Sequence, residues 1–289
     1  MKLENLQKTG SFKVRGAFNK ISQLSDEECA KGIIAASAGN HAQGVALAGK
    51  VKGVPVTIFM PETTPEAKVT ATRQYGADVR LVGKNFDEAY MASKKEQLVT
   101  GAAFVHPFDD LAIIEGQATV AMEMLQQCPG LDTIVVPAGG GGLLAGTAIA
   151  VKSIRPSVRV IGVQAQASPA IASVFHGVSN SSIPLVPTIA EGINVKEPGK
   201  LTTSIIQSYV DDVITVTEQE IASTILFMLE REKMLVEGAG AAAVAAVLHR
   251  HLPFYSANTG VIVSGGNFDI GKLESCKKIA NNIGTVSSF

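Results

Sequence analysis

Hydrophobic and polar positions follow two alternating periods along most of the chain. Short apolar runs rich in β-branched residues, typical of buried strands, occupy residues 33–36, 54–60, 79–82, 104–106, 134–137, 158–163, 213–216 and 261–263. Segments with apolar residues three or four positions apart, typical of amphipathic helices, separate most of these runs. The clearest helical segments cover residues 62–75, 85–99, 110–127 and 217–233, and an alanine-rich segment at 237–249 is expected to be a buried helix.

Strands that alternate with helices in this way predict an α/β protein with parallel sheets covered by helices on both faces. With 289 residues, of which 46% are hydrophobic, the chain can bury a sizeable core and is expected to form one globular unit of two lobes. Residues 177–200 are rich in Ser, Pro and Gly. We interpret them as a long surface loop near a site rather than a linker between domains.

Composition narrows the class of partner. The 25 Lys and Arg residues nearly balance the 26 Asp and Glu residues, so electrostatics gives no reason to expect binding of nucleic acid or of an anionic membrane. A small-molecule substrate is expected instead. The three cysteines have neither disulfide nor zinc-site spacing, no apolar run approaches the roughly 20 residues of a membrane span, and the amino terminus does not resemble a secretory signal. We therefore expect a cytoplasmic protein.

The segment Thr9-Gly10-Ser11-Phe12-Lys13-Val14-Arg15-Gly16-Ala17 precedes and begins a predicted helix. Gly10 allows a turn, Ser11 is expected to cap the helix, and Lys13 falls in its first turn. The unpaired N–H groups and the helix dipole disfavour an ammonium at that position, which makes the amine a better nucleophile. The alternative is an ordinary solvated surface lysine.

A small-residue loop, Ser37-Ala38-Gly39-Asn40-His41-Ala42-Gln43-Gly44, joins a predicted strand to a predicted helix. Open α/β sheets bind ligands at such positions, and the start of the helix offers free N–H groups for a carboxylate. The alternative is an ordinary strand-to-helix turn with a capping serine. His41 is a candidate base, although a histidine beside a turn is more often a hydrogen-bonding bystander.

Two further glycine-rich loops follow predicted strands. Four consecutive glycines at 139–142 lead into a helix and suit a backbone site for phosphate, with a flexible turn as the alternative. The loop lacks the P-loop ending and a clear ribose-binding acidic residue, although a dehydrogenase stays possible. Ser264 ends the last strand before Gly265-Gly266-Asn267, where its hydroxyl could bind a heteroaromatic nitrogen or merely cap the next helix.

Taken together, these motifs resemble fold type II pyridoxal phosphate enzymes, in particular threonine and serine dehydratases and the related serine racemases. The resemblance rests on residues 11–17, 37–41, 139–143 and 264–267, in that order, and extends from Leu3 to about Gly271. It implies a fold similar to the tryptophan synthase β chain, with two domains that each contain an open, twisted, mainly parallel sheet flanked by helices. The implied small domain covers residues 32–112, and the large domain covers residues 1–31 and 113–289.

The resemblance also implies roles for individual residues. Lys13 matches the catalytic lysine that binds pyridoxal 5′-phosphate covalently, and Phe12 matches the residue packed against the cofactor ring. Further cofactor contacts are implied for Asn40 with the ring hydroxyl, for Gly139, Gly140, Gly141, Gly142 and Leu143 with the phosphate, and for Ser264 with the pyridine nitrogen. The implied substrate-binding residues are Ser37, Gly39, Asn40 and His41, and no metal ligand is assigned.

These roles imply a lyase of amino-acid metabolism, such as isoleucine biosynthesis, that removes water and ammonia from L-threonine or L-serine. Threonine would give 2-oxobutanoate and serine would give pyruvate. A serine hydroxyl cannot keep the pyridine nitrogen firmly protonated as a carboxylate does, so elimination is expected to outrun transamination. The family also implies a homodimer or homotetramer.

Three alternatives remain open. A serine racemase with dehydratase side activity would have a second acid/base serine before the Gly-Asn pair, where this chain has Ala38. A noncatalytic binding protein on the same fold would have no need of the amine of Lys13. A cysteine-synthase-like β-replacement enzyme would have a different asparagine loop from residues 37–44.

Two differences from the family also bear on the expected function. Family members have some tens of residues before the segment that matches Leu3-Glu4-Asn5, and this sequence lacks them. The residues after Gly271 are too few for the regulatory carboxyl-terminal domain of biosynthetic threonine dehydratases, so isoleucine feedback is not expected. A short form of the catabolic type is the better match, and an activating nucleotide or a cation near Glu191 stays possible.

Overall fold

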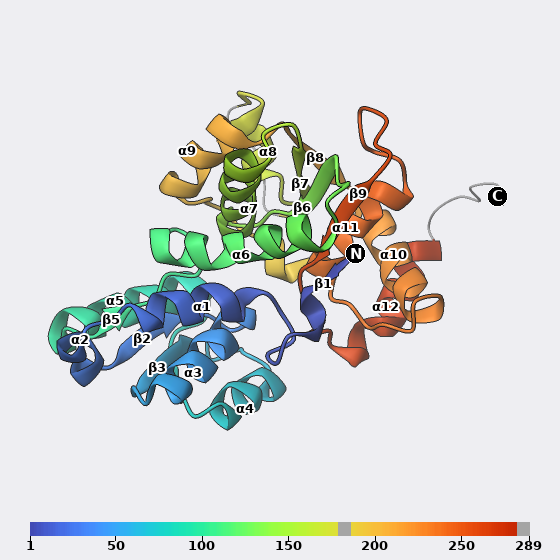
Figure 1. The fold of residues 1–289 in the computed structure, drawn as a ribbon. Coiled ribbons are helices and arrows are strands. Elements are labelled where there is room, and N and C mark those ends of the chain that lie inside the picture. Colours follow the sequence, from blue (N-terminus) through green and yellow to red (C-terminus); the bar gives the residue numbers. More distant parts are fainter. Residues whose placement is uncertain (179–185, 282–289) are drawn as a thin grey trace. The chain divides into compact units, whose positions relative to one another are not determined.

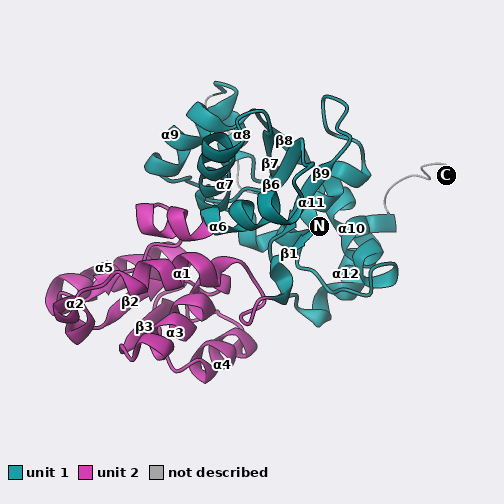
Figure 2. Cartoon of the chain, viewed as in Figure 1, with its two compact units in different colours: residues 1–6, 118–289 teal, residues 7–117 magenta. Residues whose placement is uncertain are grey.

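The computed structural model describes residues 1–178 and 186–281. The chain forms two compact units, of which unit 1 contains Met1–Leu6 and Ala118–Phe289 and unit 2 contains Gln7–Gln117 (Figure 2). The boundary between them falls inside helix α6 (Leu111–Gln127). Unit 2 contains the whole predicted small domain of residues 32–112, together with residues 7–31 and 113–117.

Unit 2 is built on a parallel sheet of four strands in the order β4-β3-β2-β5. Figure 1 labels β2, β3 and β5 of this sheet. The strands are β2 (Ile33–Ala36), β3 (Val56–Met60), β4 (Asp78–Leu81) and β5 (Ala103–Phe104). The helices are α1 (Lys13–Ser22), α2 (Asp26–Lys31), α3 (Asn40–Lys52), α4 (Glu66–Gln74) and α5 (Phe86–Thr100). All four residues of β2 are buried, as expected for a strand covered on both faces.

Local sequence explains where several of these helices begin and end. Ser25 and Glu28 form a reciprocal capping box at the start of α2. At the start of α5, the side-chain oxygen of Asn85 accepts a hydrogen bond from the backbone N–H of Glu88 at 3.0 Å. Gly53 and Gly101 end α3 and α5 in the left-handed conformation that glycine adopts without strain.

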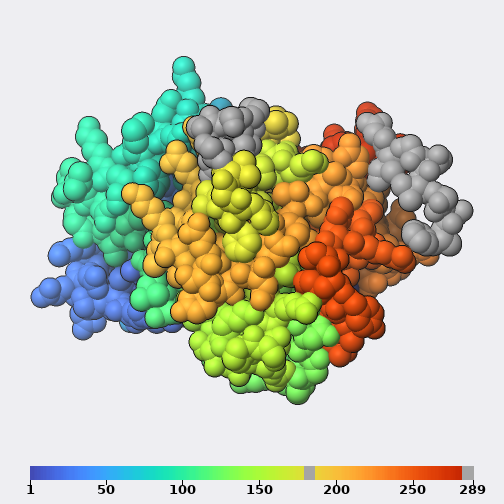
Figure 3. Space-filling view, turned by 90° about the horizontal axis from the view of Figure 1, so that it is seen from above, coloured from blue at the N-terminus to red at the C-terminus, as the bar shows by residue number. Residues whose placement is uncertain are grey.

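Unit 1 is built on a parallel sheet of five strands in the order β1-β9-β6-β7-β8. The strands are β1 (Lys2–Leu3), β6 (Thr133–Pro137), β7 (Arg159–Ala165), β8 (Asp212–Val216) and β9 (Thr259–Val263). The helices are α7 (Gly142–Ile154), α8 (Ala170–Phe175), α9 (Lys200–Tyr209), α10 (Glu218–Glu230), α11 (Gly238–Leu248) and α12 (Leu273–Asn281). Helices α8 and α9 contact each other, and Figure 3 shows the yellow and gold atoms of this region side by side.

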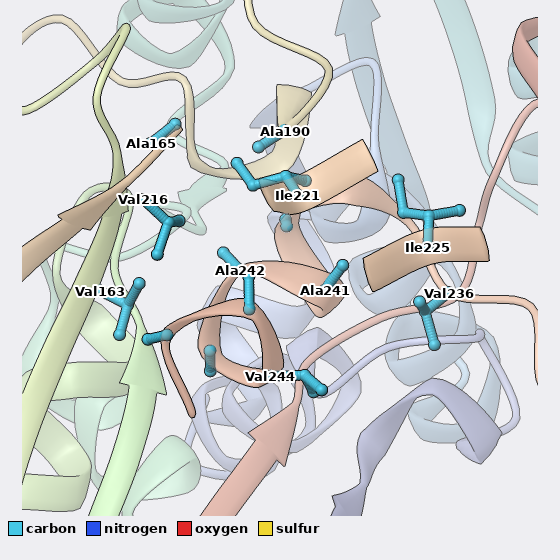
Figure 4. Packing of buried hydrophobic residues seen from close by; sticks show 14 of the residues in the cluster. Val163, Ala165, Ala190, Val216, Ile221, Ile225, Val236, Ala241, Ala242 and Val244 are labelled. Carbon is cyan, nitrogen blue, oxygen red and sulfur yellow. The ribbon is translucent and has the colours of Figure 1, made fainter. Parts of the chain in front are cut away.

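Helix α11 forms the centre of the unit 1 core. Its residues 238–246 are all buried, and Figure 4 shows Ala241, Ala242 and Val244 among side chains of the neighbouring strands and of α10. Small residues allow this close packing, because a Cβ atom on Gly240 would lie 2.3 Å from the carbonyl oxygen of Gly265. The prediction of a buried helix at 237–249 is confirmed.

The expected α/β fold with parallel sheets is confirmed, and each predicted strand has a counterpart in the structure. The predicted helix at 62–75 is too long, because α4 starts after Pro65, and a proline cannot donate an intrahelical hydrogen bond. The predicted loop at 177–200 falls partly outside the described residues, since residues 179–185 are not described. Its remaining part contains a single 3-10 turn, Glu191–Ile193. In the described part of the chain, no helix is long and apolar enough to span a membrane.

Candidate active site

Lys13 is the first residue of α1, but the expected cap by Ser11 is wrong. Phe12 occupies the N-cap position with helical backbone angles of φ −59° and ψ −20°, and its side chain has no polar group that could cap the helix. Ser11 therefore lies one residue too early to reach the first turn. Its hydroxyl is buried and has no hydrogen-bond partner among the described residues. In the first turn of α1, the N–H of Arg15 donates to the carbonyl oxygen of Phe12 at 3.0 Å, and the N–H of Gly16 donates to Oε1 of Gln117 at 3.2 Å.

The amine of Lys13 is held within unit 2. Its Nζ donates a hydrogen bond to the carbonyl oxygen of Pro107 at 2.8 Å and lies 5.3 Å from the centre of the Phe12 ring. Both Lys13 and Phe12 are half-buried. The alternative of a solvated surface lysine therefore does not describe this side chain.

The loop at 37–41 leaves the start of α3 open. Gly39 is the N-cap residue, so no side chain caps the helix there, and a Cβ atom at Gly39 would meet nothing within 4 Å. The Ser37 hydroxyl accepts a hydrogen bond from the N–H of Gly39 at 3.2 Å, and Asn40 begins the helix. An uncapped helix start beside open space is suited to a carboxylate.

His41 has a buried side chain, with 3% of its surface exposed. Its Nε2 lies 2.9 Å from the carbonyl oxygen of Val105, and because a carbonyl can only accept, Nε2 carries the proton. Burial, and then the charge of Lys13, lower the pKa of His41 to about 3. The imidazole is therefore neutral near pH 7, and the group of His41 best placed to bind an anion is its backbone N–H in the first turn of α3.

The four glycines connect β6 to α7 in unit 1. Gly141, the N-cap of α7, has a φ of +96°, which favours glycine, and it has no side chain that could cap the helix. A Cβ atom on Gly139 would lie 2.9 Å from Cα of Ile193, so the loop packs closely against the turn at Glu191–Ile193. The N–H groups of Gly142 and Leu143 start a helix that offers them no intrahelical acceptor.

Thr202 is a residue of this loop region that sequence reasoning missed. It is fully buried in the first turn of α9, and its hydroxyl lies 2.8 Å from the carbonyl oxygen of Gly140 and 3.1 Å from that of Gly199. The N–H of Gly199 also donates to Gly140, at 3.3 Å. The Pro198-Gly199 pair before an apolar helix could have indicated that α9 begins here.

Ser264 follows β9 and is buried. Strands β6 and β9 are parallel neighbours, with Val135 opposite Val261, so the glycine loop and Ser264 both lie at the carboxyl edge of the unit 1 sheet. In unit 2, α1 and α3 pack together and bring Lys13 near the start of α3. The structure thus groups the predicted residues into two sets, one in each unit.

A family model described as "Pyridoxal-phosphate dependent enzyme" matches residues 1–265. The chain belongs to this family of pyridoxal phosphate enzymes.

Similar proteins are named for one activity in particular. The chain is 49% identical over 274 residues to an L-threonine ammonia-lyase of Thermotoga maritima, covering 95% of this chain and 68% of that protein. It is 43% identical over 275 residues to the catabolic L-threonine dehydratase of Escherichia coli K12, covering 94% and 84%.

Solved structures with the same fold include a threonine deaminase and a serine racemase. The processed threonine deaminase isoform 2 of Solanum lycopersicum superposes with a TM-score of 0.90 at 37% identity, covering 97% of this chain and 78% of that one. The serine racemase of Dictyostelium discoideum superposes with a TM-score of 0.86 at 38% identity, covering 93% and 87%.

The residues present fit the cofactor of the family. Pyridoxal phosphate needs an amine for covalent attachment, an anion site for its phosphate and a polar partner for its ring nitrogen. Lys13 provides a half-buried amine, the glycine-capped start of α7 provides unpaired N–H groups, and Ser264 provides a buried hydroxyl. No group of three or more His, Cys, Asp or Glu side chains in the described residues is arranged to hold a metal ion.

Proposed function

We propose that this chain is an L-threonine ammonia-lyase that also acts on L-serine. It would convert threonine into 2-oxobutanoate and ammonia, and serine into pyruvate and ammonia. The observation that carries the proposal is the amine of Lys13, which is half-buried at a helix start and held by a neutral carbonyl acceptor. The identity of 43–51% to proteins named for this activity supports the same choice.

The cofactor-binding residues are proposed from the family. Lys13 would bind the cofactor covalently beside Phe12, Asn40 would contact its ring hydroxyl, residues 139–143 would hold its phosphate, and Ser264 would face its pyridine nitrogen. When bound, pyridoxal phosphate withdraws electrons from the α-carbon of an amino acid and so acidifies the bond from that carbon to hydrogen.

The remaining steps depend on the side chains of the protein. The hydrogen bond from Nζ of Lys13 to Pro107 orients the amine, which in its neutral form would take the α-proton of the substrate. Ser37 and the open start of α3, with the N–H groups of Asn40 and His41, would hold the substrate carboxylate. Fixing the carboxylate limits the orientations in which the α-proton can face the amine.

The proposal is tested by adding pyridoxal phosphate and L-threonine to the purified chain and measuring 2-oxobutanoate and ammonia. The Lys13→Ala variant should lose at least about a thousandfold in turnover, because it removes both the attachment point and the base. Lys8→Ala, which removes an exposed lysine five positions earlier, is the matched control and should retain activity. Full activity of Lys13→Ala, or no product from the unmodified chain, would refute the proposal.

A cytoplasmic location and a homodimer or homotetramer are also proposed from the family. Light scattering during size-exclusion chromatography gives the mass in solution. A mass equal to that of one 30.1 kDa chain would contradict the proposed assembly.

A further inference from the structure

The carbonyl of Pro107, which accepts from Lys13, belongs to a turn that is fixed on both sides by histidines. We refer to residues 105–109 as the Pro107 turn. Before Pro107, the Nε2–H of His41 donates to the carbonyl oxygen of Val105 at 2.9 Å. After Pro107, the N–H groups of Phe108 and Asp109 donate to Nδ1 of His106 at 3.3 and 2.8 Å. All of these residues lie in unit 2.

The hydrogen bonds define the proton positions of both imidazoles. His41 donates through Nε2 to a carbonyl, whereas His106 accepts two N–H groups at Nδ1, so a neutral His106 carries its proton on Nε2. Burial lowers the pKa of both histidines. Neutral rings with defined tautomers are suited to holding main-chain groups rather than to moving protons.

The turn is also tied to the sheet and to neighbouring rings. The N–H of Val105 donates to the carbonyl oxygen of Ile34 in β2 at 2.9 Å, so the turn starts directly from the sheet. The His106 ring packs edge-on against Phe108, with ring centres 4.8 Å apart. The direction of the Pro107 carbonyl is therefore set by the strand, by two imidazoles and by an aromatic contact.

We propose that His41 and His106 are positioning residues for Lys13: by fixing the Pro107 turn, they make its carbonyl hold one N–H of the amine and direct the nitrogen lone pair. This inference rests on the proposed function, because it concerns the amine that attaches the cofactor and takes the α-proton. A carbonyl is a suitable acceptor for this task. It orients the amine without placing a full negative charge beside it, whereas a carboxylate would stabilise the ammonium, which has no lone pair.

Paired substitutions separate positioning from proton transfer. His41→Leu removes the donor to Val105, whereas in His41→Gln the amide nitrogen can replace Nε2. His106→Leu removes the acceptor of the turn, whereas in His106→Asn the amide oxygen can replace Nδ1. His176→Leu is the matched control, because His176 makes the same kind of bond, from Nε2 to the carbonyl oxygen of Val213 at 2.8 Å, within unit 1.

The main measurement is the rate at which full-length protein forms its covalent bond with added pyridoxal phosphate, followed by absorbance in a stopped-flow instrument. The two leucine variants should form it at least about tenfold more slowly, since a buried group that loses its hydrogen-bond partner no longer fixes the turn. His106→Asn and His176→Leu should stay within about threefold of the unmodified protein, and His41→Gln should form the bond faster than His41→Leu. Turnover of threonine should show the same order, with kcat reduced and KM little changed.

Hydrogen exchange of the amides of Val105, His106, Phe108 and Asp109 provides a second readout, and exchange should be faster in the leucine variants. If His41→Leu does not fold, the comparison of His106→Leu with His106→Asn decides the question, because His106 is only half-buried.

Wild-type rates of bond formation in the leucine variants would overturn the positioning role. Loss of activity in both conservative variants would overturn it as well, since it would indicate proton transfer by the rings. A chain that binds the cofactor but does not produce 2-oxobutanoate would refute the proposed function without bearing on the first test.

Discussion

Gly44 of α3 lies directly against the backbone of Lys13 in α1. A Cβ atom on Gly44 would be 3.1 Å from both the carbonyl carbon and the carbonyl oxygen of Lys13. The two helices can pack this closely because glycine has no side chain at the contact. The backbone position of Lys13 therefore depends on Gly44 as well as on the residues of its own helix.

We expect Gly44→Ala to reduce threonine turnover about tenfold while the protein remains folded. The added methyl group would have to move the first turn of α1 by a few tenths of an ångström, and small displacements of a reacting group are costly in rate. The check is kcat for threonine, normalised to the amount of cofactor covalently bound.

Gly49→Ala is the matched control on the same helix. Its Cβ atom would lie 2.1 Å from a methyl group of Val56, away from Lys13, so it disturbs the packing of α3 on β3. This variant should lose about 1–3 kcal/mol of unfolding free energy and retain kcat per folded molecule. Equal losses of kcat in both variants would show that Gly44 matters only for stability.

Thr202→Val should weaken the binding of pyridoxal phosphate about tenfold. Valine keeps the shape of threonine but removes the hydroxyl that donates to Gly140, so the glycine loop loses one of its fixed hydrogen bonds. Equilibrium titration with the cofactor, followed by absorbance, measures the effect. Thr202→Ser keeps the hydroxyl and should bind nearly as well as the unmodified protein, and equal affinity of the Val and Ser variants would contradict this role.

Ala38→Ser should increase the formation of D-serine from L-serine at least about tenfold. The substitution places a serine where the resemblance to eukaryotic serine racemases implies an acid/base residue, and a positioned hydroxyl can exchange a proton that a methyl group cannot. Ala38 is half-buried beside the unit 2 core, where one oxygen atom adds little volume. Chiral chromatography of the products gives the ratio of D-serine to pyruvate. An unchanged ratio would show that Ala38 is not what limits racemisation.

The periodicity of the sequence was sufficient to predict the strands, because strands buried in a parallel sheet are continuous apolar runs. β2 (Ile33–Ala36) is the clearest case, since its predicted and observed bounds agree. β1 (Lys2–Leu3) was missed because two residues carry no periodicity, and only their pairing with β9 makes them a strand.

The candidate site was predictable only in part. Lys13 and the glycine loop stand out in the sequence. A lysine at a helix start predicts a more nucleophilic amine, and four consecutive glycines before a helix predict an anion site, both from neighbouring residues alone. Pro107 and Thr202 contribute through tertiary contacts with residues 94 and 62 positions away, which no local pattern reveals. The Ser11 cap failed for a local reason, because the helical angles of Phe12 move the N-cap by one residue.

The neutral, buried state of His41 predicts how stability depends on pH. Its pKa falls from 6.5 in the unfolded chain to about 3 in the folded protein, so between these values the unfolded chain binds one more proton. Stability from this group is therefore fully present above about pH 6.5 and decreases as the pH falls, by up to about 1.4 kcal/mol per pH unit until about pH 3.

His41→Gln removes this titration but keeps a donor for Val105. Between about pH 7 and about pH 5, the unfolding free energy of the unmodified protein should fall about 2 kcal/mol further than that of the variant. Urea denaturation at a series of pH values measures both curves, and other titrating groups cancel in the difference because both proteins contain them. If the two curves stay parallel, His41 must accept a proton in the folded protein. Its Nε2–H could still hold Val105 in that case, but the ring would be a cation beside Lys13, and the position of the amine would itself depend on pH.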